Sequence, residues 1–347
     1  MGVVSRIDAY QRRHRWIGLP LAVVYKFSDD QGNYLTAQIT YYGFVSLFPL
    51  MLLLVTSLGY ALQASHHLQQ QVLDSALAQF PVIGDQIASS IYSLHGSVLS
   101  LVVGALGTVY GGLGIAQATQ NALNQVWGVP RNARPNPVKA RLRSLLLMVI
   151  GGVAALVTTG LSALSAAASA YGASLSDLVL VVASLLAVAL NVALFLVTFR
   201  VLTGRYVAIR QIRAGAIVAA IGWQGLQWAG TYLLGDKLKG ATATYGLFGL
   251  VLGLMLWIYL GAFIVVICAE LNVVRAERLW PRSLLTPFTD NVRLTQGDRR
   301  AYLSYPQTER HKGFQTIDVD FEPPPQSDPE TSPPLKNVPG NTAPQPE

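Results

Sequence analysis

Six stretches of the sequence contain no Asp, Glu, Lys or Arg, and each is long enough to cross a lipid bilayer. They cover residues 31–73, 86–130, 144–176, 178–199, 214–235 and 240–269. A membrane-spanning helix needs roughly 20 mostly apolar residues, so each stretch can hold one span. We therefore predict an all-α membrane protein, a bundle of six transmembrane helices. The predicted spans cover about 37–61, 98–120, 145–168, 178–199, 214–235 and 247–268.

The charged residues are concentrated in the segments between these stretches and follow a consistent pattern. Segments 131–143 and 200–213 carry Arg and Lys with no acidic residue, whereas 62–97 and 169–177 carry only Asp. The positive-inside rule places both basic segments, and with them both termini, in the cytoplasm. This topology accounts for most of the net charge of +7, so we do not predict binding to nucleic acid.

The composition divides the chain into three parts. Residues 1–30 read as a cytoplasmic, basic, partly amphipathic arm on the inner membrane surface. Residues 31–282 hold the six-helix transmembrane domain, and within them 62–95 is predicted to form two short amphipathic helices that cap the bundle outside. Residues 283–347 are predicted to be a cytoplasmic, Pro-rich, disordered tail, because the last 25 residues are almost wholly polar or Pro.

The first span, "GNYLTAQITYYGFVSLFPLMLLL" at 32–54, contains polar residues that a simple membrane anchor does not need. Polar groups are costly when they face lipid without a partner, so they are expected to face inward. There they can either bind neighbouring helices or line a substrate path, and the sequence leaves both open. The residues assigned to such a path are Gln38, Tyr41, Tyr42, Ser46, Pro49, Asn124, Asn191, Gln224, Gln227 and Glu270.

Other features of the spans favour structural roles. The glycines at 104, 107, 111 and 114 form one helix face, for which close helix packing is the favoured interpretation. No span interior holds an Asp, Glu, Lys or Arg; Glu270 lies at the cytoplasmic end of the sixth span, where an interfacial salt bridge is the competing explanation. With a single cysteine, Cys268, and no catalytic motif, we predict no enzyme activity, cofactor or metal site.

Several motifs resemble the YihY/BrkB family of bacterial inner-membrane proteins over roughly 20–280. The motifs are "TAQITYYGFVSLFPLMLLL", "NALNQVW", "RAGAIVAAIGWQGLQW", "YGLFG" and "LWIYLGAFIVVICAEL". The family usually has Gly-Ala-Glu near the end of the last span, where this chain has Cys268, Ala269 and Glu270. The resemblance implies a multi-pass protein of the bacterial plasma membrane, linked to serum resistance or to lipid movement. The family also carries an old ribonuclease BN label, which nothing in these residues supports.

Two functional hypotheses follow. The first is a transporter or flippase-like protein for an anionic lipid or another amphiphile, with cytoplasmic arginines at the head group. Those arginines are Arg131, Arg134, Arg141, Arg143, Arg200 and Arg205, and positive-inside topology alone also explains them. The second is a scaffold that transports nothing and binds envelope proteins through its outer loop and tail. A polar cavity that opens to one side of the membrane or to the lipid favours transport, and a solidly packed bundle favours the scaffold.

Overall fold

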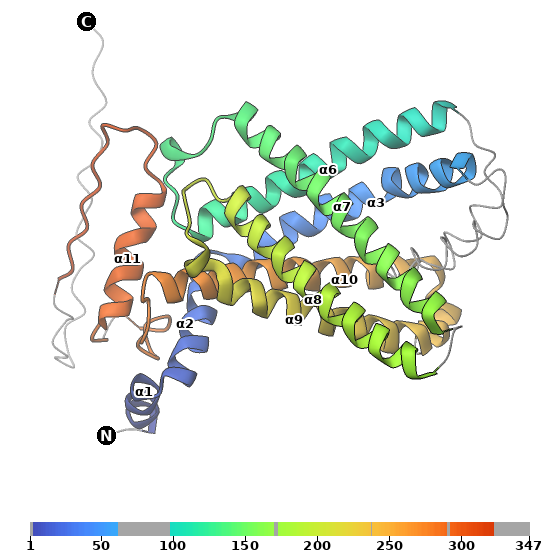
Figure 1. Cartoon of the computed structure of the whole chain (residues 1–347). Helices are drawn as coiled ribbons and strands as arrows, with labels where there is room; N and C mark the ends of the chain where they lie inside the picture. The colour runs from blue at the N-terminus through green and yellow to red at the C-terminus, as the bar shows by residue number, and fades with distance from the viewer. Residues whose placement is uncertain (1–2, 62–97, 170–172, 237, 290–291, 323–347) are drawn as a thin grey trace, which may run out of the picture.

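The computed structural model describes residues 3–61, 98–169, 173–236, 238–289 and 292–322, and this part of the chain forms helices and no strands (Figure 1). The long helices are α3 (Gly32–Ala61), α6 (Val98–Val126), α7 (Pro137–Ser169), α8 (Ala173–Leu202), α9 (Ile209–Asp236) and α10 (Leu238–Ala276). The shorter elements are α1 (Val3–Arg13), α2 (Arg15–Asp29), the 3-10 turn η1 (Arg131–Ala133) and α11 (Gln296–Thr308). The predicted all-α class is confirmed.

Each of the six long helices contains one predicted span. Four of them include a segment that is long and apolar enough to cross a membrane, within the described residues. These segments are Gly32–Leu53, Leu101–Val126, Leu185–Leu202 and Val251–Ala276. The count of six spans stays a prediction, and the capping helices predicted at 62–95 lie outside the described residues.

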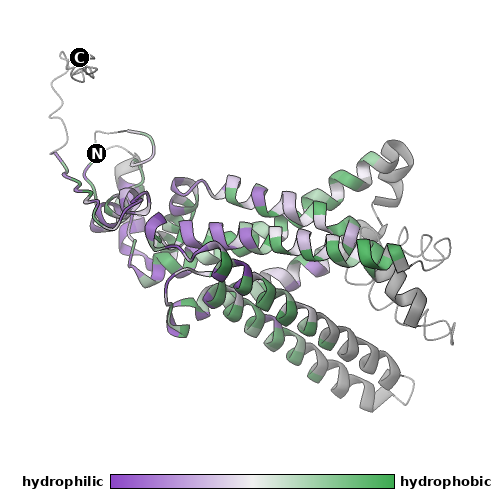
Figure 2. Ribbon diagram, turned by 90° about the horizontal axis from the view of Figure 1, so that it is seen from above, coloured by the Kyte–Doolittle hydropathy of each residue, from purple (hydrophilic) through white to green (hydrophobic). Residues whose placement is uncertain are grey.

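The outer faces of the long helices expose large apolar side chains, as a protein surrounded by lipid requires. Examples from five helices are Phe48, Leu106, Val149, Leu185 and Leu256. Monomeric soluble proteins rarely expose such extensive apolar surface. Hydropathy also differs along the molecule. Hydrophilic residues are concentrated at the end that holds the chain termini (Figure 2).

The six long helices are arranged as a closed ring in chain order. α3 packs against α6, α6 against α7, α7 against α8, α8 against α9 and α9 against α10, and α10 then returns to α3. The contact between α3 and α6 is the most extensive of these. This ring leaves room for a space in the middle of the bundle.

Glycine on α6 permits the close approach of α3. A Cβ atom at Gly107 would lie 2.6 Å from the Cβ of Pro49, and one at Gly111 would lie 2.5 Å from the Cβ of Ser46. A Cβ at Gly114 would lie 2.5 Å from the ring of Tyr42. The interpretation of this glycine face as a packing surface is therefore confirmed.

The arm predicted at residues 1–30 includes α2, and its position on the inner membrane surface stays a prediction. This helix packs against α10, and its Ala22, Val23 and Phe27 belong to the same buried apolar cluster as the long helices. Apolar contact with α10 removes these side chains from solvent, which a helix lying alone on a surface would not achieve. The boundary predicted at residue 30 therefore divides a single packed unit.

The predicted disordered tail at 283–347 is wrong for its first part. Residues 296–308 form α11, whose first turn is closed by a capping box between Thr295 and Asp298. Asp298 is fully buried and its Oδ1 lies 2.5 Å from Nε of Arg282. Specific polar contacts therefore order a segment that offers little apolar surface. Residues 323–347 lie outside the described residues.

One end of the bundle carries most of the polar structure, and we call it the α11 end. Figure 1 shows α1, α2, α11 and the basic links from α6 to α7 and from α8 to α9 gathered there. The sequence predicted that these segments share one side of the membrane, and the fold brings them together at one end of the bundle. That this side is the cytoplasm stays a prediction.

Candidate functional site

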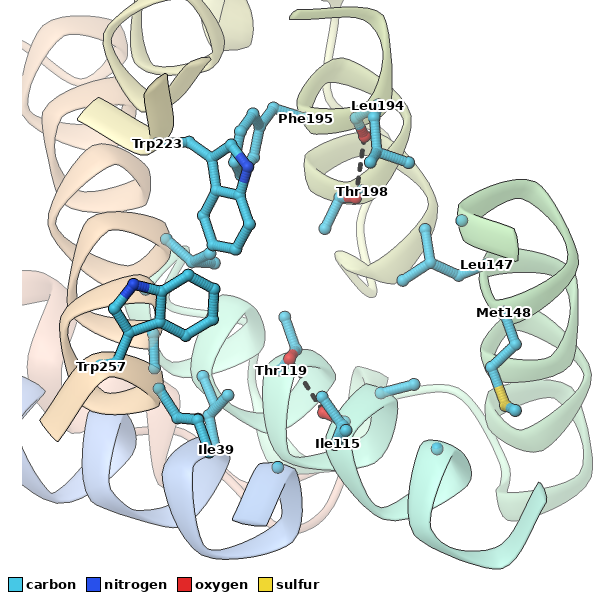
Figure 3. Close-up of a pocket in the computed structure, with 18 residues that line it drawn as sticks. Ile39, Ile115, Thr119, Leu147, Met148, Leu194, Phe195, Thr198, Trp223 and Trp257 are labelled. Carbon is cyan, nitrogen blue, oxygen red and sulfur yellow. Dashed lines mark hydrogen bonds between the residues drawn. The ribbon is translucent and has the colours of Figure 1, made fainter. Parts of the chain in front are cut away.

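A cavity of about 420 Å³ lies in the middle of the ring, and all six long helices contribute to its wall (Figure 3). Its lining residues are Ile39, Gly43, Gly112, Ile115, Ala116, Thr119, Leu147, Met148, Gly151, Leu194, Phe195, Thr198, Trp223, Trp257, Ile258, Gly261, Ala262 and Val265. Its volume falls within the roughly 300–1,000 Å³ typical of ligand pockets. The bundle is therefore hollow rather than solidly packed.

The wall of the cavity is apolar in character, including its two threonines. Thr119 donates a hydrogen bond to the carbonyl of Ile115 and Thr198 donates one to the carbonyl of Leu194, each at 2.8 Å. Both hydroxyls are thus engaged by their own helices. A wall of this kind is suited to hydrocarbon, because it offers few free polar groups to a ligand.

Two tryptophans form one side of the cavity. Trp223 of α9 and Trp257 of α10 lie with their ring centroids 5.7 Å apart and their planes at 59°. Figure 3 shows them facing Leu147 and Met148 of α7 across the space. Aromatic rings provide large apolar contact surfaces at such a wall.

None of the ten residues predicted for a substrate path lines this cavity. Gln38 and Tyr41 lie exposed on the outer side of α3, with Tyr41 61% exposed. Gln38 accepts a hydrogen bond from Nδ2 of Asn121 at 3.2 Å. Tyr42 is half-buried and packs into the apolar core beside Gly114. The described cavity is thus apolar rather than polar, and neither tyrosine of the pair lines it.

The remaining residues of the predicted path are dispersed. Ser46 is buried against Gly111 and donates to the carbonyl of Gly43, and Pro49 packs on Gly107. Asn124 is buried and accepts a hydrogen bond from the backbone N–H of Gly204 at 2.6 Å. The other four differ in burial: Gln224 is exposed, Asn191 and Gln227 are half-buried, and Glu270 is fully buried. The structure does not bring these residues together, and their part in transport stays a prediction.

The six arginines predicted to contact a head group all lie at the α11 end, but several have protein partners. Nε of Arg131 lies 2.8 Å from Oε2 of Glu309 on the chain just after α11. Nη2 of Arg205 lies 2.5 Å from Oε1 of Glu277, and its guanidinium stacks over Trp127. These two arginines are therefore neutralised by acidic residues of the chain.

The other four differ in how firmly they are held. Arg134 is half-buried and donates to Asn121, Gln125 and the carbonyl of Val129. Arg143 is half-buried and donates to the carbonyl of Thr203, whereas Arg200 is exposed and lies over the ring of Tyr206. Arg141 is exposed at the start of α7. The exposed Arg141 and Arg200 are the best placed of the six for a ligand outside the protein.

A cluster of buried charges, which we call the charge cluster, lies where α2 meets α10. It consists of Lys26, Asp30 and Glu270, which are 3%, 5% and 0% exposed. Nζ of Lys26 contacts Oδ2 of Asp30, donates to the carbonyl of Val126 at 3.2 Å and lies 3.7 Å from Oε2 of Glu270. The cluster thus joins α2, α6 and α10.

Burial and charge act in opposite directions in this cluster. Burial lowers the pKa of Lys26, but the carboxyl groups of Glu270 and Asp30 outweigh it and leave that pKa above its usual value. Burial raises the pKa of Asp30 in spite of Lys26. Helix α11 covers the cluster, because the ring of Tyr305 lies 5.4 Å from Nζ of Lys26.

Part of this cluster can be expected from the sequence, which places Glu270 at the end of the sixth predicted span, with an interfacial salt bridge as one explanation. Lys26 is the basic residue nearest to it in the fold. Lys26 and Asp30 were not predicted as functional residues. Their spacing of four on a helix is the local signal, because such residues lie on one helix face, but nothing local indicates that Glu270 is their neighbour.

A family model described as "Virulence factor BrkB" matches residues 23–289, which include the cavity and the charge cluster. The chain belongs to the BrkB family. Its relatives include the "Putative ribonuclease-like protein YfkH" of Bacillus subtilis (strain 168), which is 24% identical over 73% of this chain and 93% of its own length. The "Inner membrane protein YhjD" of Escherichia coli (strain K12) is 27% identical over 70% of this chain and 77% of its own length.

A UPF0761 membrane protein of Psychrobacter sp. (strain PRwf-1) is 23% identical over 81% of this BrkB-family chain and 53% of its own length. No solved structure matches the chain. The resemblance to the YihY/BrkB family is thus confirmed, and the chain is a membrane protein of that family. The ribonuclease-like wording belongs to the name of one relative and carries no enzymatic assignment to this chain.

Proposed function

We propose that this BrkB-family protein binds an amphiphile with an anionic head group, a membrane lipid, and moves it across the bacterial inner membrane. The observation that carries the proposal is the apolar cavity of about 420 Å³ at the centre of six long helices. An acyl chain can occupy such a space without leaving polar groups unpaired. A bundle that served only as a scaffold has no need for this hollow.

The α11 end supplies the second part of the proposal. By the positive-inside rule this end, with both termini, faces the cytoplasm. Arg141 and Arg200 are exposed there, at the start of α7 and the end of α8, and both helices also line the cavity. A phosphate head group at the membrane surface can contact these guanidinium groups while its chains reach into the bundle.

The test uses two adjacent glycines on α7. Gly151 lines the cavity and Gly152 is exposed on the outside, and a Cβ atom at either position would have no neighbour within 4 Å. Gly151→Leu should fill part of the cavity without a clash, whereas Gly152→Leu adds the same atoms to the outer surface. The second variant is therefore a matched control.

Both variants and the wild type are to be reconstituted in phosphatidylcholine vesicles that contain a fluorescent phosphatidylglycerol. The rate at which the labelled lipid reaches the other leaflet is then measured with a membrane-impermeant quencher. We expect Gly151→Leu to slow transfer several-fold and Gly152→Leu to leave it unchanged. Equal rates in all three proteins, or no transfer by the wild type above protein-free vesicles, would contradict the proposal.

The alternative function, a non-transporting scaffold for envelope proteins, assigned binding to the outer loop and the tail. Those segments, 62–97 and 323–347, lie outside the described residues. The hollow bundle supports transport over this alternative. If the wild type moves no lipid and retains a bound envelope protein through purification, the scaffold becomes the better explanation.

A further inference from the structure

The charge cluster contains more acidic than basic groups, and all of them are buried. It has one cation, Lys26, and two carboxyl groups, Asp30 and Glu270, all at most 5% exposed. If all three were ionised, the cluster would carry one uncompensated negative charge. Burying such a charge is costly, and two neighbouring carboxyl groups usually avoid it by holding a proton between them.

The hydrogen bonds indicate which carboxyl group lacks support. Oδ2 of Asp30 accepts a hydrogen bond from the ammonium group of Lys26. No group in the described residues donates a well-formed hydrogen bond to either oxygen of Glu270, although the side chain is fully buried and Lys26 Nζ is 3.7 Å from its Oε2. The carboxyl groups of Glu270 and Asp30 are close enough to interact with each other, as a shared proton requires. A carboxylate without donors is poorly stabilised, whereas a neutral carboxylic acid has less need of them.

We propose that Lys26, Asp30 and Glu270 form a proton-binding site, in which the two carboxyl groups hold one proton, chiefly on Glu270, and Lys26 neutralises the other carboxylate. In the protonated form the cluster has no net charge. In the deprotonated form it carries one buried negative charge, which weakens the junction of α2 with α10. The proposal does not depend on whether the central cavity binds a lipid.

Other acidic residues near the cluster have cations of their own, so the excess charge is confined to the cluster. The nearby pairs are Asp29 with Arg282, Glu277 with Arg205 and Glu309 with Arg131. Helix α6 contributes the carbonyl of Val126, and α11 contributes the ring of Tyr305.

Arg282 can be compared with Lys26, because it also forms ion pairs with two acidic residues. Its partners Asp29 and Asp298 both receive further donors: Tyr305 donates to Asp29, and the backbone N–H groups of Ser283 and Thr295 donate to Asp298. Two carboxylates can thus be held by one cation where other donors assist. Glu270 has no additional hydrogen-bond donors of this kind, and binding a proton removes the charge that they would otherwise stabilise.

Asp30 connects the cluster to the surface. It lines a small hollow of about 20 Å³ beneath α11, together with Lys26 and Tyr305. It also lines a polar hollow of about 270 Å³ whose wall includes the exposed Gln31 and Arg131. A proton from this outer hollow can therefore reach Glu270 through the carboxyl group of Asp30.

Infrared spectroscopy of the full-length protein in detergent, followed as a function of pH, tests this directly. A protonated carboxylic acid has a carbonyl stretching band that an ionised carboxylate lacks. We expect the wild type to show such a band, which disappears as the pH is raised. Glu270→Gln should abolish it and Asp30→Asn should shift or abolish it. Glu277→Gln, a change at an exposed acid directly after α10, should leave it intact.

A second readout is the dependence of the unfolding temperature on pH. The folded protein retains the proton to a higher pH than the unfolded chain, so stability is complete at low pH and is lost as the pH rises through the titration of the folded cluster. The wild type should show this loss and Glu270→Gln should not. If the wild type shows no titrating band, or if the band persists in both Glu270→Gln and Asp30→Asn, the proposal is wrong.

Discussion

The centre of the bundle and its α11 end are built from different interactions. The described cavity at the centre is lined by apolar side chains of six helices and by threonines whose hydroxyls are bound to their own backbone. The α11 end instead buries Lys26, Arg282 and Asp298 among specific polar partners. The first region is held together by non-directional apolar contacts, and the second by directional contacts.

This difference in interactions indicates which part of the molecule can change shape. Apolar contacts are non-directional, so helices around the cavity can shift and repack at modest cost. A buried ion pair that loses one partner leaves a charge without compensation, which strongly opposes rearrangement. We therefore expect the α11 end to act as a fixed base and the centre to adapt to what it binds.

The largest expected effect concerns the buried cation Arg282 at the α11 end. Arg282→Met should lower the free energy of unfolding by about 3–5 kcal/mol, because Asp298 and Asp29 lose their buried cation. Arg131→Met removes a cation from an exposed pair and should cost less than about 1 kcal/mol. Chemical unfolding of both variants in detergent measures the difference. Equal costs would show that burial does not distinguish the two sites.

The second prediction compares tight and open positions along the bundle. Gly111→Ala places a methyl group 2.5 Å from the Cβ of Ser46, so overpacking should cost roughly 1–3 kcal/mol. Gly151→Ala points into the cavity, where a Cβ has no neighbour within 4 Å. The second change should be neutral or stabilising, since alanine favours helix more than glycine does. Thermal unfolding of both variants provides the comparison, and a cost at Gly151 matching that at Gly111 would argue against an open cavity.

The smallest expected effect concerns an exposed ion pair, Arg131 with Glu309, whose contribution to stability depends on pH. The hydrogen bond from Arg131 lowers the pKa of Glu309 in the folded state. Its contribution is therefore present above the unfolded pKa of glutamate, about 4.3, and is lost as the pH falls through the lower folded value. The pair is exposed, so we expect a loss below about 1 kcal/mol. The rate at which a protease cleaves the segment after α11, followed as the pH is lowered, measures this loss. In the Glu309→Gln variant the rate should not change with pH for this reason.

Sequence patterns predicted the helical class and the positions of the long helices well. Long charge-free runs are a local property, and each of the six runs holds a long helix. The glycine face of α6 was also predictable, because residues at this spacing fall on one side of a helix and small side chains permit close approach. The family followed from motifs in α3, α6, α9 and α10.

Two features were beyond the reach of local patterns. The tail was predicted to be disordered because it is polar, yet α11 is ordered by the contact of Asp298 with Arg282. Sequence patterns drew attention to the polar residues of the spans, whereas the described cavity is lined by apolar ones such as Trp223 and Trp257. In both cases the deciding contact joins residues that are separated in the sequence.

Local patterns in the sequence are enough to predict an all-helical membrane protein whose basic segments share one side. Hydropathy, length and charge suffice for that, because the bilayer acts on each segment separately. Only the tertiary structure decided which helix faces enclose the cavity and that Lys26 and Asp30 meet Glu270. The rotation of each helix about its axis depends on all its neighbours at once, so a buried charge or an open cavity emerges only when the ring of helices has closed.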